Sequence, residues 1–196
     1  MKALSRTARR AIPGFLQAGD YAQTDEGLLV HSSIRIRGKY TDWVNGDDRR
    51  VNYNLLVDQG ILYILEAALG NNTALATLYL APYGTNIAPA NDWTAASFTG
   101  TAGEITSTSE GWAGTNREEW DAGAAASGAI SNSASRASHT IVSTGPVNIY
   151  GAGLISSQLR GAATGTLVSA VQFGAVRTVN NTDNWELAYE VELTDS

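Results

Sequence analysis

The residue types able to do acid–base or metal chemistry are few and scattered. The two histidines, His31 and His139, lie far apart in the sequence. His139 stands in a segment with the pattern of a β-strand, where a hydrogen-bonded or exposed histidine is commoner than a ligand or a base. Neither an H-E-x-x-H motif nor a two-histidine, one-carboxylate spacing occurs. A metal site would need ligands that are almost all oxygen, so we expect no metal and no cofactor.

Acidic residues form adjacent pairs, including Asp47-Asp48 and Glu118-Glu119. Adjacent side chains of an extended chain point in opposite directions, so Glu118 and Glu119 are not expected to share a proton. Glu118 and Trp120 would share a face, and a carboxylate beside an indole suits contact with a sugar. A glycosidase needs two opposed carboxylates at a set separation, which nothing in this sequence fixes. We therefore expect a protein that is not an enzyme.

Glycine and cysteine usage excludes several other kinds of site. Gly151-Ala152-Gly153 is a lone G-x-G without the third glycine and the following helix of a dinucleotide site. Glycine inside a strand more often marks a bulge or a close approach of two backbones. The chain has no cysteine, which excludes a disulfide framework and a thiolate metal site.

Three tryptophans stand out in residues 83–132, a segment rich in glycine, serine and threonine. They are Trp93, Trp112 and Trp120. Large aromatic residues in such a background indicate an ordered loop layer with contact anchors. We take the three tryptophans as candidate partner-binding residues, with a glycan or a receptor as the partner.

Residues 1–32 look irregular and are interrupted by Pro13-Gly14. Four cations precede the first acidic residue, and apolar residues lie between and after them. The candidate contact residues of this arm are Lys2, Arg6, Arg9, Arg10 and Phe15. The arm has three interpretations: contact with an acidic protein, contact with DNA, or a solvated tail. Partner contact is favoured, because a disordered tail usually holds fewer apolar residues.

Composition bounds the class of partner. Charged residues make up 16% of the 196 residues, below the ~25% of ordinary soluble domains, so the surface suits packing against other subunits. The net charge of −6 argues against nucleic acid as the main partner. No apolar run is long enough for a bilayer and the basic start lacks the apolar core of a signal peptide. We expect no membrane contact.

Residues 54–70 give the one helix that the sequence predicts, over about 58–69. Asp58 is the expected N-cap and Gly70 the expected end. The apolar positions at helical spacing are Ile61, Ile64, Leu65 and Ala68. We expect this apolar face to pack on the core.

Most other regular segments have strand patterns. Asn45-Gly46 predicts a two-residue hairpin turn, because both residues tolerate positive φ. The expected strands are 34–37, 51–55, 77–82, 104–107, 137–143, 147–156, 167–173 and 185–194. The prediction is a mainly β fold, an antiparallel, jelly-roll-like β-sandwich over residues 33–196 with one short helix, preceded by an extended N-terminal arm over residues 1–32.

Several motifs resemble those of virion proteins of tailed bacteriophages. Residues 43–70 are similar to a hairpin that leads into an N-L-(I/V)-V-D-x-G-L-N-x-L-L helix, although Ile61 replaces the usual leucine. Residues 131–141 resemble an N-S-x-S-R-A-x-F-T stretch, with His139 where that group often has an aromatic residue. Residues 149–157 and 165–173 resemble I-Y-G-A-F-L-x-S and G-T-L-x-S-A-x-x-F. The likeness covers roughly residues 35–194.

This resemblance implies a non-enzymatic structural protein located in the virion and assembled in the host cytoplasm. We expect a capsid decoration or cement protein that stabilises the particle through its N-terminal arm. Its partners would be major capsid proteins or neck and tail proteins, and it would form a homo-oligomer, with a trimer as one option. The alternative is a neck, collar or tail-fibre-associated protein that binds a receptor or a carbohydrate.

Overall fold

A computed structural model describes residues 21–24, 27–30, 34–70, 75 and 77–195. The chain divides into two compact units, Met1–Ile36 with Leu193–Ser196, and Arg37–Glu192. The first unit contains an antiparallel hairpin of β1 (Tyr21–Thr24) and β2 (Gly27–Val30) inside the region predicted to be irregular. The second unit is a sandwich of two antiparallel sheets, which confirms the predicted fold class.

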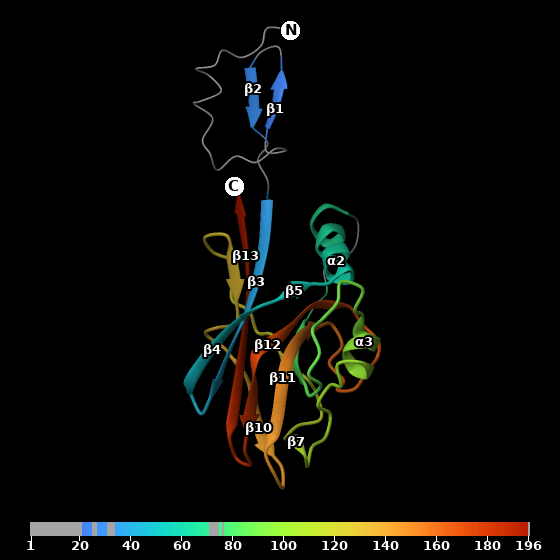
Figure 1. Ribbon diagram of the computed structural model, residues 1–196, viewed down its shortest axis with the longest axis vertical. Coiled ribbons are helices and arrows are strands. Elements are labelled where there is room, and N and C mark those ends of the chain that lie inside the picture. Colours follow the sequence, from blue (N-terminus) through green and yellow to red (C-terminus); the bar gives the residue numbers. More distant parts are fainter. Residues whose placement is uncertain (1–20, 25–26, 31–33, 71–74, 76, 196) are drawn as a thin grey trace. The chain divides into compact units, whose positions relative to one another are not determined.

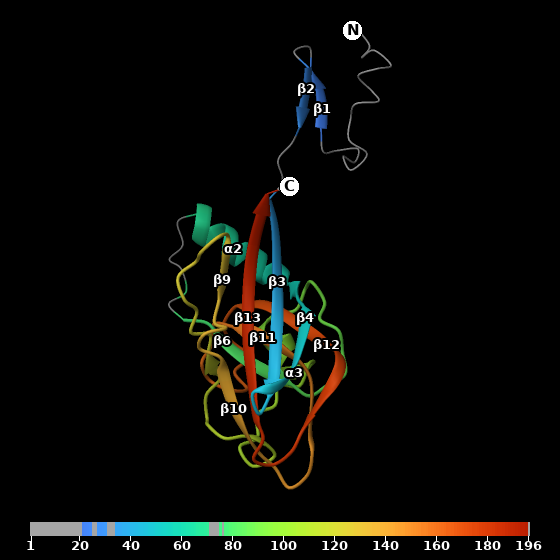
Figure 2. The same ribbon diagram turned by 90° about the vertical axis from the view of Figure 1, so that its left-hand side faces the viewer.

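The first sheet of the sandwich is built around β13. Its strands are β3 (Ile34–Val44), β4 (Asp47–Tyr53), β7 (Gly111–Trp112), β9 (Ala129–Ser131), β10 (Ala137–Val142) and β13 (Asn184–Asp195). The strand order is β4-β3-β13-β10-β7, with β9 also paired to β13. Figure 2 shows β3 and β13 side by side. Asn45 and Gly46 have φ of 54° and 81°, which confirms the predicted hairpin turn.

The second sheet is built around β11 and β12 (Figure 1). Its strands are β5 (Leu55–Leu56), β6 (Tyr79–Tyr83), β8 (Glu118–Glu119), β11 (Val147–Ile155) and β12 (Leu167–Val179). The order is β5-β12-β11-β6-β8, which leaves β5 and β8 as its edges. The predicted strand at 104–107 is wrong: only Glu104 forms an isolated bridge, with Tyr83.

The second sheet is buried on both faces. One face meets the first sheet in a cluster that includes Leu154 of β11 and Trp185 and Tyr189 of β13. The opposite face packs against a loop layer in a second cluster that includes Ile155 and Phe98. Because both faces of this sheet are buried, most residues of β11 and β12 are apolar or small. In β13, by contrast, apolar and polar residues alternate along the strand.

Two glycines of β11 let neighbouring groups approach the strand closely, Phe98 of α3 at one and Val171 of β12 at the other. A Cβ on Gly153 would lie 2.6 Å from the Phe98 ring, and one on Gly151 would lie 2.0 Å from the Val171 carbonyl oxygen. The pairing register of β11 with β12 also shifts between Ile149 and Gly151. The G-x-G of the sequence is therefore a packing feature of a strand, as its lack of a nucleotide-binding context indicated.

The described residues form two helices rather than the one predicted, α2 (Asp58–Leu69) and α3 (Ala95–Gly100). The six-residue α3 is too short to show apolar periodicity. Its visible signal is Thr94, whose hydroxyl accepts a hydrogen bond from the Ser97 backbone N–H at 3.4 Å. The buried Phe98 holds α3 against the second sheet.

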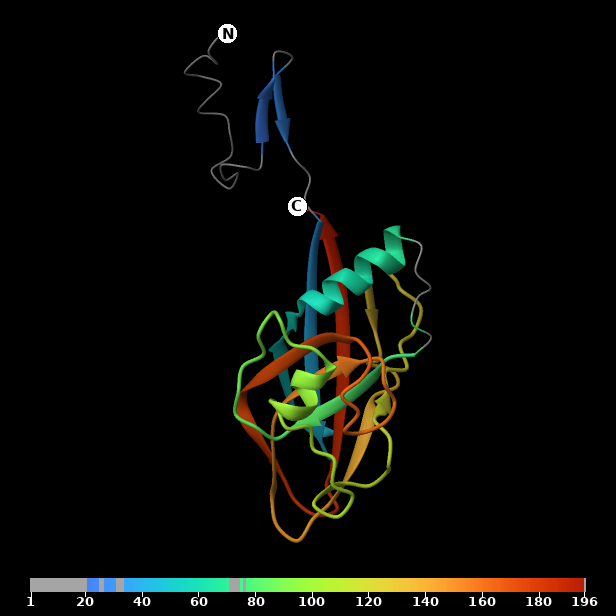
Figure 3. The same ribbon diagram turned by 90° about the vertical axis from the view of Figure 1, so that its right-hand side faces the viewer.

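Helix α2 spans Asp58–Leu69, which confirms the predicted range, and it packs on β12 through its first turn (Figure 3). The N-cap is Val57 and no side chain caps the helix, so the prediction of Asp58 as N-cap is wrong. Gly60 is buried, and a Cβ there would lie 1.9 Å from the Val168 carbonyl oxygen. Gln59 accepts a hydrogen bond from the Leu167 N–H at 2.8 Å. These contacts fix which side of α2 faces the sandwich.

The expected apolar packing face of α2 is largely exposed. Ile61 is 42% exposed and Leu65 is 50% exposed, and Ala68 is exposed as well. Only Ile64 of the predicted face is half-buried. The prediction that this face packs on the core is wrong, because the close contact at Gly60 places the side of the helix that carries Gly60, and not the side of Ile61 and Leu65, against β12.

Candidate interaction surfaces

The five candidate residues of the N-terminal arm lie outside the described residues. They are Lys2, Arg6, Arg9, Arg10 and Phe15. Their assignment as partner contacts stays a prediction.

Two of the three candidate tryptophans belong to the core. Trp93 is 6% exposed and meets Tyr83 edge to face, with ring centroids 6.2 Å apart. Trp112 is 1% exposed and lies under the guanidinium of Arg160, 3.4 Å from the ring centroid. At this burial they offer almost no contact area to a partner. The sequence signal of aromatic residues in a loop layer indicated packing here, not a contact surface.

Trp120 is half-buried and reaches a pocket beside α2. Its indole N–H donates to the Tyr189 carbonyl at 2.9 Å, which fixes the ring. The pocket has a volume of about 290 Å³. Trp120 and Tyr63 line it together with the acidic side chains of Glu119 and Asp121. Such a lining offers aromatic surface next to acceptors for hydroxyl groups.

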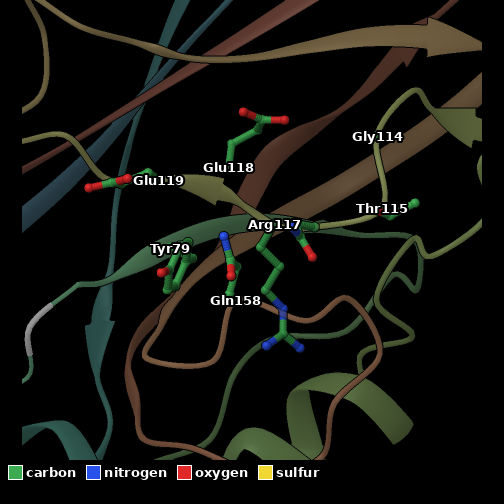
Figure 4. Close-up of a pocket in the computed structure, with 8 residues that line it drawn as sticks. Tyr79, Gly114, Thr115, Arg117, Glu118, Glu119 and Gln158 are labelled. Atoms are coloured by element: carbon green, nitrogen blue, oxygen red, sulfur yellow. The ribbon is translucent and has the colours of Figure 1, made fainter.

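A second pocket of about 330 Å³ lies at the edge strand β8 (Figure 4). Glu118 and Glu119 both line it, and Figure 4 shows their side chains pointing in different directions, as the sequence predicted. Partial burial raises the pKa of Glu118, while the charge of Arg160 opposes that rise. No second carboxylate faces Glu118 across this pocket's described lining, so the pair needed for glycoside hydrolysis is not assembled there.

Arg117 also lines this pocket, and Figure 4 shows its guanidinium pointing away from the side chains of Glu118 and Glu119. This guanidinium forms a buried ion pair with Glu104. The Arg117 guanidinium donates to both carboxylate oxygens of Glu104, at 2.8 and 2.7 Å, and both side chains are 0% exposed. It also donates to the carbonyls of Ser157 and Ala162, and Glu104 accepts from the Gly161 N–H at 3.0 Å. This network ties β8 to the loop that precedes β12. Neither residue stands out in the sequence.

Arg160 organises the neighbouring loops in a similar way. Its guanidinium donates to four carbonyls, those of Ile105, Ser107, Trp112 and Gly114. Burial lowers the pKa of Arg160, and the nearby Glu104 charge opposes this. Because every carbonyl belongs to residues 105–114, this one side chain holds the segment before β8 in place.

The exposed apolar surface that sequence reasoning missed is on α2. Four aliphatic side chains are exposed there: Ile61 at 42%, Leu62 at 59%, Leu65 at 50% and Leu69 at 84%. At 100° per residue these positions fall within one arc of about 100°, opposite Gly60. We call this surface the α2 stripe. A signal for it was present, because residues 61–65 are five consecutive apolar residues and cannot all face one core.

Within the described part of the chain, no group of three or more histidine, aspartate or glutamate side chains has the arrangement of a metal site. The same residues contain no helix long and apolar enough to cross a membrane. No protein-family model matches the chain, and a search among curated proteins finds no significant match.

Proposed function

We propose that this protein is a non-enzymatic structural component of a tailed-bacteriophage virion, acting as a capsid decoration or cement protein. The α2 stripe is the observation that carries the assembly role. Four large aliphatic side chains on one helix face are held in water by a fold that fixes their direction. Contiguous exposed apolar surface of this kind marks sites of association.

The virion setting rests on the sequence motifs of residues 35–194 that resemble phage virion proteins. The low content of charged residues, 16%, supports a surface that is covered in an assembly. The cations of the arm contrast with the acidic remainder of the chain, so an arm that reaches a neighbouring acidic subunit gains both apolar burial and charge attraction. Repetition by particle symmetry would multiply this effect.

Deleting residues 2–12 is expected to remove most copies of the protein from assembled particles, because the deletion removes the cations of the arm and the large apolar residues Leu4 and Ile12. The measurement is the copy number per particle by quantitative gel or mass spectrometry. The triple variant Arg6→Gln/Arg9→Gln/Arg10→Gln separates charge from apolar contact. Full occupancy of particles by the deletion variant would refute the proposal that the arm holds the protein on the particle.

The pocket beside Trp120 supports a second candidate, a neck- or tail-associated protein that binds a carbohydrate. Trp120 and Tyr63 supply aromatic surface, and Glu119 and Asp121 supply carboxylates in the same 290 Å³ space. Sugar rings bind where an apolar face stacks on an aromatic ring and hydroxyls meet acceptors.

A glycan that binds this pocket is expected to lose about tenfold in affinity in the Glu119→Gln variant, because a charged acceptor is replaced by a neutral amide. The matched control is Asp92→Asn, an exposed acid away from the pocket. A glycan array followed by calorimetry on the hits measures the effect. An array without hits, or equal losses in both variants, would count against this candidate.

A further inference from the structure

The α2 stripe has a fixed direction and defined dimensions. Leu65 and Leu69 follow Ile61 at intervals of four residues, and Leu62 widens the row. A 12-residue helix is about 18 Å long. The contacts of Gln59 and Gly60 with β12 prevent the helix from rotating to bury these side chains. The stripe is therefore a permanent surface of the folded chain.

The charges on and beside α2 are acidic. The helix carries Asp58 in its first turn and contains no lysine or arginine. The adjoining pocket at Tyr63 adds the exposed carboxylates of Glu119 and Asp121. An occupant that joins apolar side chains with cations fits this surface better than a neutral or acidic one.

Pairing of two α2 stripes alone does not account for the surface. Four aliphatic side chains on one short helix offer less than the ~800 Å² that each partner buries in a stable complex. Two acidic helices in contact would also bring like charges together. A stable contact needs a longer, basic occupant.

The N-terminal segment 2–16 of this chain has the required chemistry. It joins the cations Lys2, Arg6, Arg9 and Arg10 with the apolar residues Leu4, Ile12, Phe15 and Leu16, and contains no acidic residue. Fifteen residues can extend to about 50 Å, so the segment is long enough to follow the whole stripe and reach the acids beside it.

We propose that the α2 stripe binds segment 2–16 of a neighbouring copy of the protein. This inference rests on the proposed function, in which the N-terminal arm links subunits. An arm that links subunits must bind a copy of the protein other than its own. The apolar residues of the segment would cover Ile61, Leu62 and Leu65, and its cations would meet the carboxylates around α2. Each copy then gives one arm and receives one, a head-to-tail arrangement that closes into a ring when the rotation between copies permits.

The test uses the full chain with a photoreactive phenylalanine analogue in place of Phe15. Equal amounts of ¹⁴N- and ¹⁵N-labelled protein are mixed, illuminated and digested, and the cross-linked peptides are identified by mass spectrometry. The expected product joins position 15 to residues 58–69 and includes pairs of mixed isotope. Cross-links to α2 that never mix isotopes would overturn the proposal, since the arm would then bind its own copy. Cross-links that avoid α2 would overturn it as well.

Variants of the α2 stripe provide an independent test of the proposed contact. Leu62→Gln/Leu65→Gln is expected to weaken self-association at least tenfold in analytical ultracentrifugation, because two exposed leucines no longer bury apolar area. The matched control is Leu159→Gln, since Leu159 is 60% exposed and lies outside α2. Equal association of the double variant and the control would refute the proposed contact. Particle occupancy is measured separately and tests the proposed function. Loss of the α2 contact with full dependence of occupancy on the arm would therefore refute this inference alone.

Discussion

Replacing Arg117 with methionine is expected to lower the free energy of unfolding by about 3–5 kcal/mol, because it leaves a buried carboxylate without its counter-charge. Glu104 is fully shielded from solvent and receives two hydrogen bonds from Arg117. The same change removes the hydrogen bonds that Arg117 donates to the carbonyls of Ser157 and Ala162, at 2.8 and 3.1 Å, and leaves the Ala162 carbonyl with the Thr99 hydroxyl as its donor. The free energy of unfolding of a domain of this size is only about 5–15 kcal/mol, so the expected loss is a large fraction of it.

Urea unfolding followed by tryptophan fluorescence measures this effect. The matched control is Arg49→Met, at an exposed arginine of the first sheet, with an expected change below about 0.5 kcal/mol. The double variant Arg117→Met/Glu104→Met removes both charges and is expected to recover much of the loss. A single variant as stable as the control would show that the ion pair contributes little.

The second large effect is a loss of stability in acid through His139. The ring is 0% exposed and lies between Trp112 and Trp185, with centroid distances of 5.1 and 4.9 Å. Among the described residues, neither ring nitrogen has a hydrogen-bond partner of ordinary geometry. Burial, together with the nearby charge of Arg160, lowers the pKa of His139 from 6.5 to about 3.

The direction of the pH effect follows from proton binding. Between pH 6.5 and about 3 the unfolded chain binds a proton at His139 that the folded chain does not. Stability therefore falls as the pH falls through this window, by about 1.4 kcal/mol per pH unit well below pH 6.5. From pH 6.5 to pH 4.5 this one group is expected to cost about 2 kcal/mol.

The variant His139→Phe isolates this contribution from that of the carboxylates. It keeps an aromatic ring between the two tryptophans and removes the titratable group and two buried polar atoms. The free energy of unfolding, measured in urea from pH 7 to pH 4, is expected to fall less steeply in the variant than in the natural sequence. Parallel curves for the two proteins would show that His139 does not protonate on unfolding in this range.

The strands were predictable wherever local pattern and turn chemistry agreed. The Asn45-Gly46 turn and the alternation of β13 each fix which side chains face inward, and Trp185 and Leu187 are buried as expected. The apolar run of β11 indicated a buried strand, and Leu154 and Ile155 lie in the core.

The orientation of α2 was not predictable from periodicity, because a helix that is apolar on several sides has more than one candidate core face. A single glycine decides the orientation: only Gly60 allows the backbone of α2 to lie against Val168. The Arg117–Glu104 ion pair likewise forms only in the folded structure. The same holds for the burial of His139 without hydrogen-bond partners of ordinary geometry for its ring nitrogens among the described residues. No spacing in the sequence marks such partners, since they come from different segments of the chain.

The order of strands in the first sheet has a consequence for biosynthesis. β13 lies between β3 and β10 in the sheet but follows every other strand of the sandwich in the sequence. While a ribosome is still making the chain, β3 and β10 therefore lack the strand that joins them. The sandwich can close only after β13 has been translated, so the pairing of its first sheet must wait for the last of its strands. Unpaired edges of β3 and β10 are exposed until then, which makes the nascent chain the stage most vulnerable to aggregation.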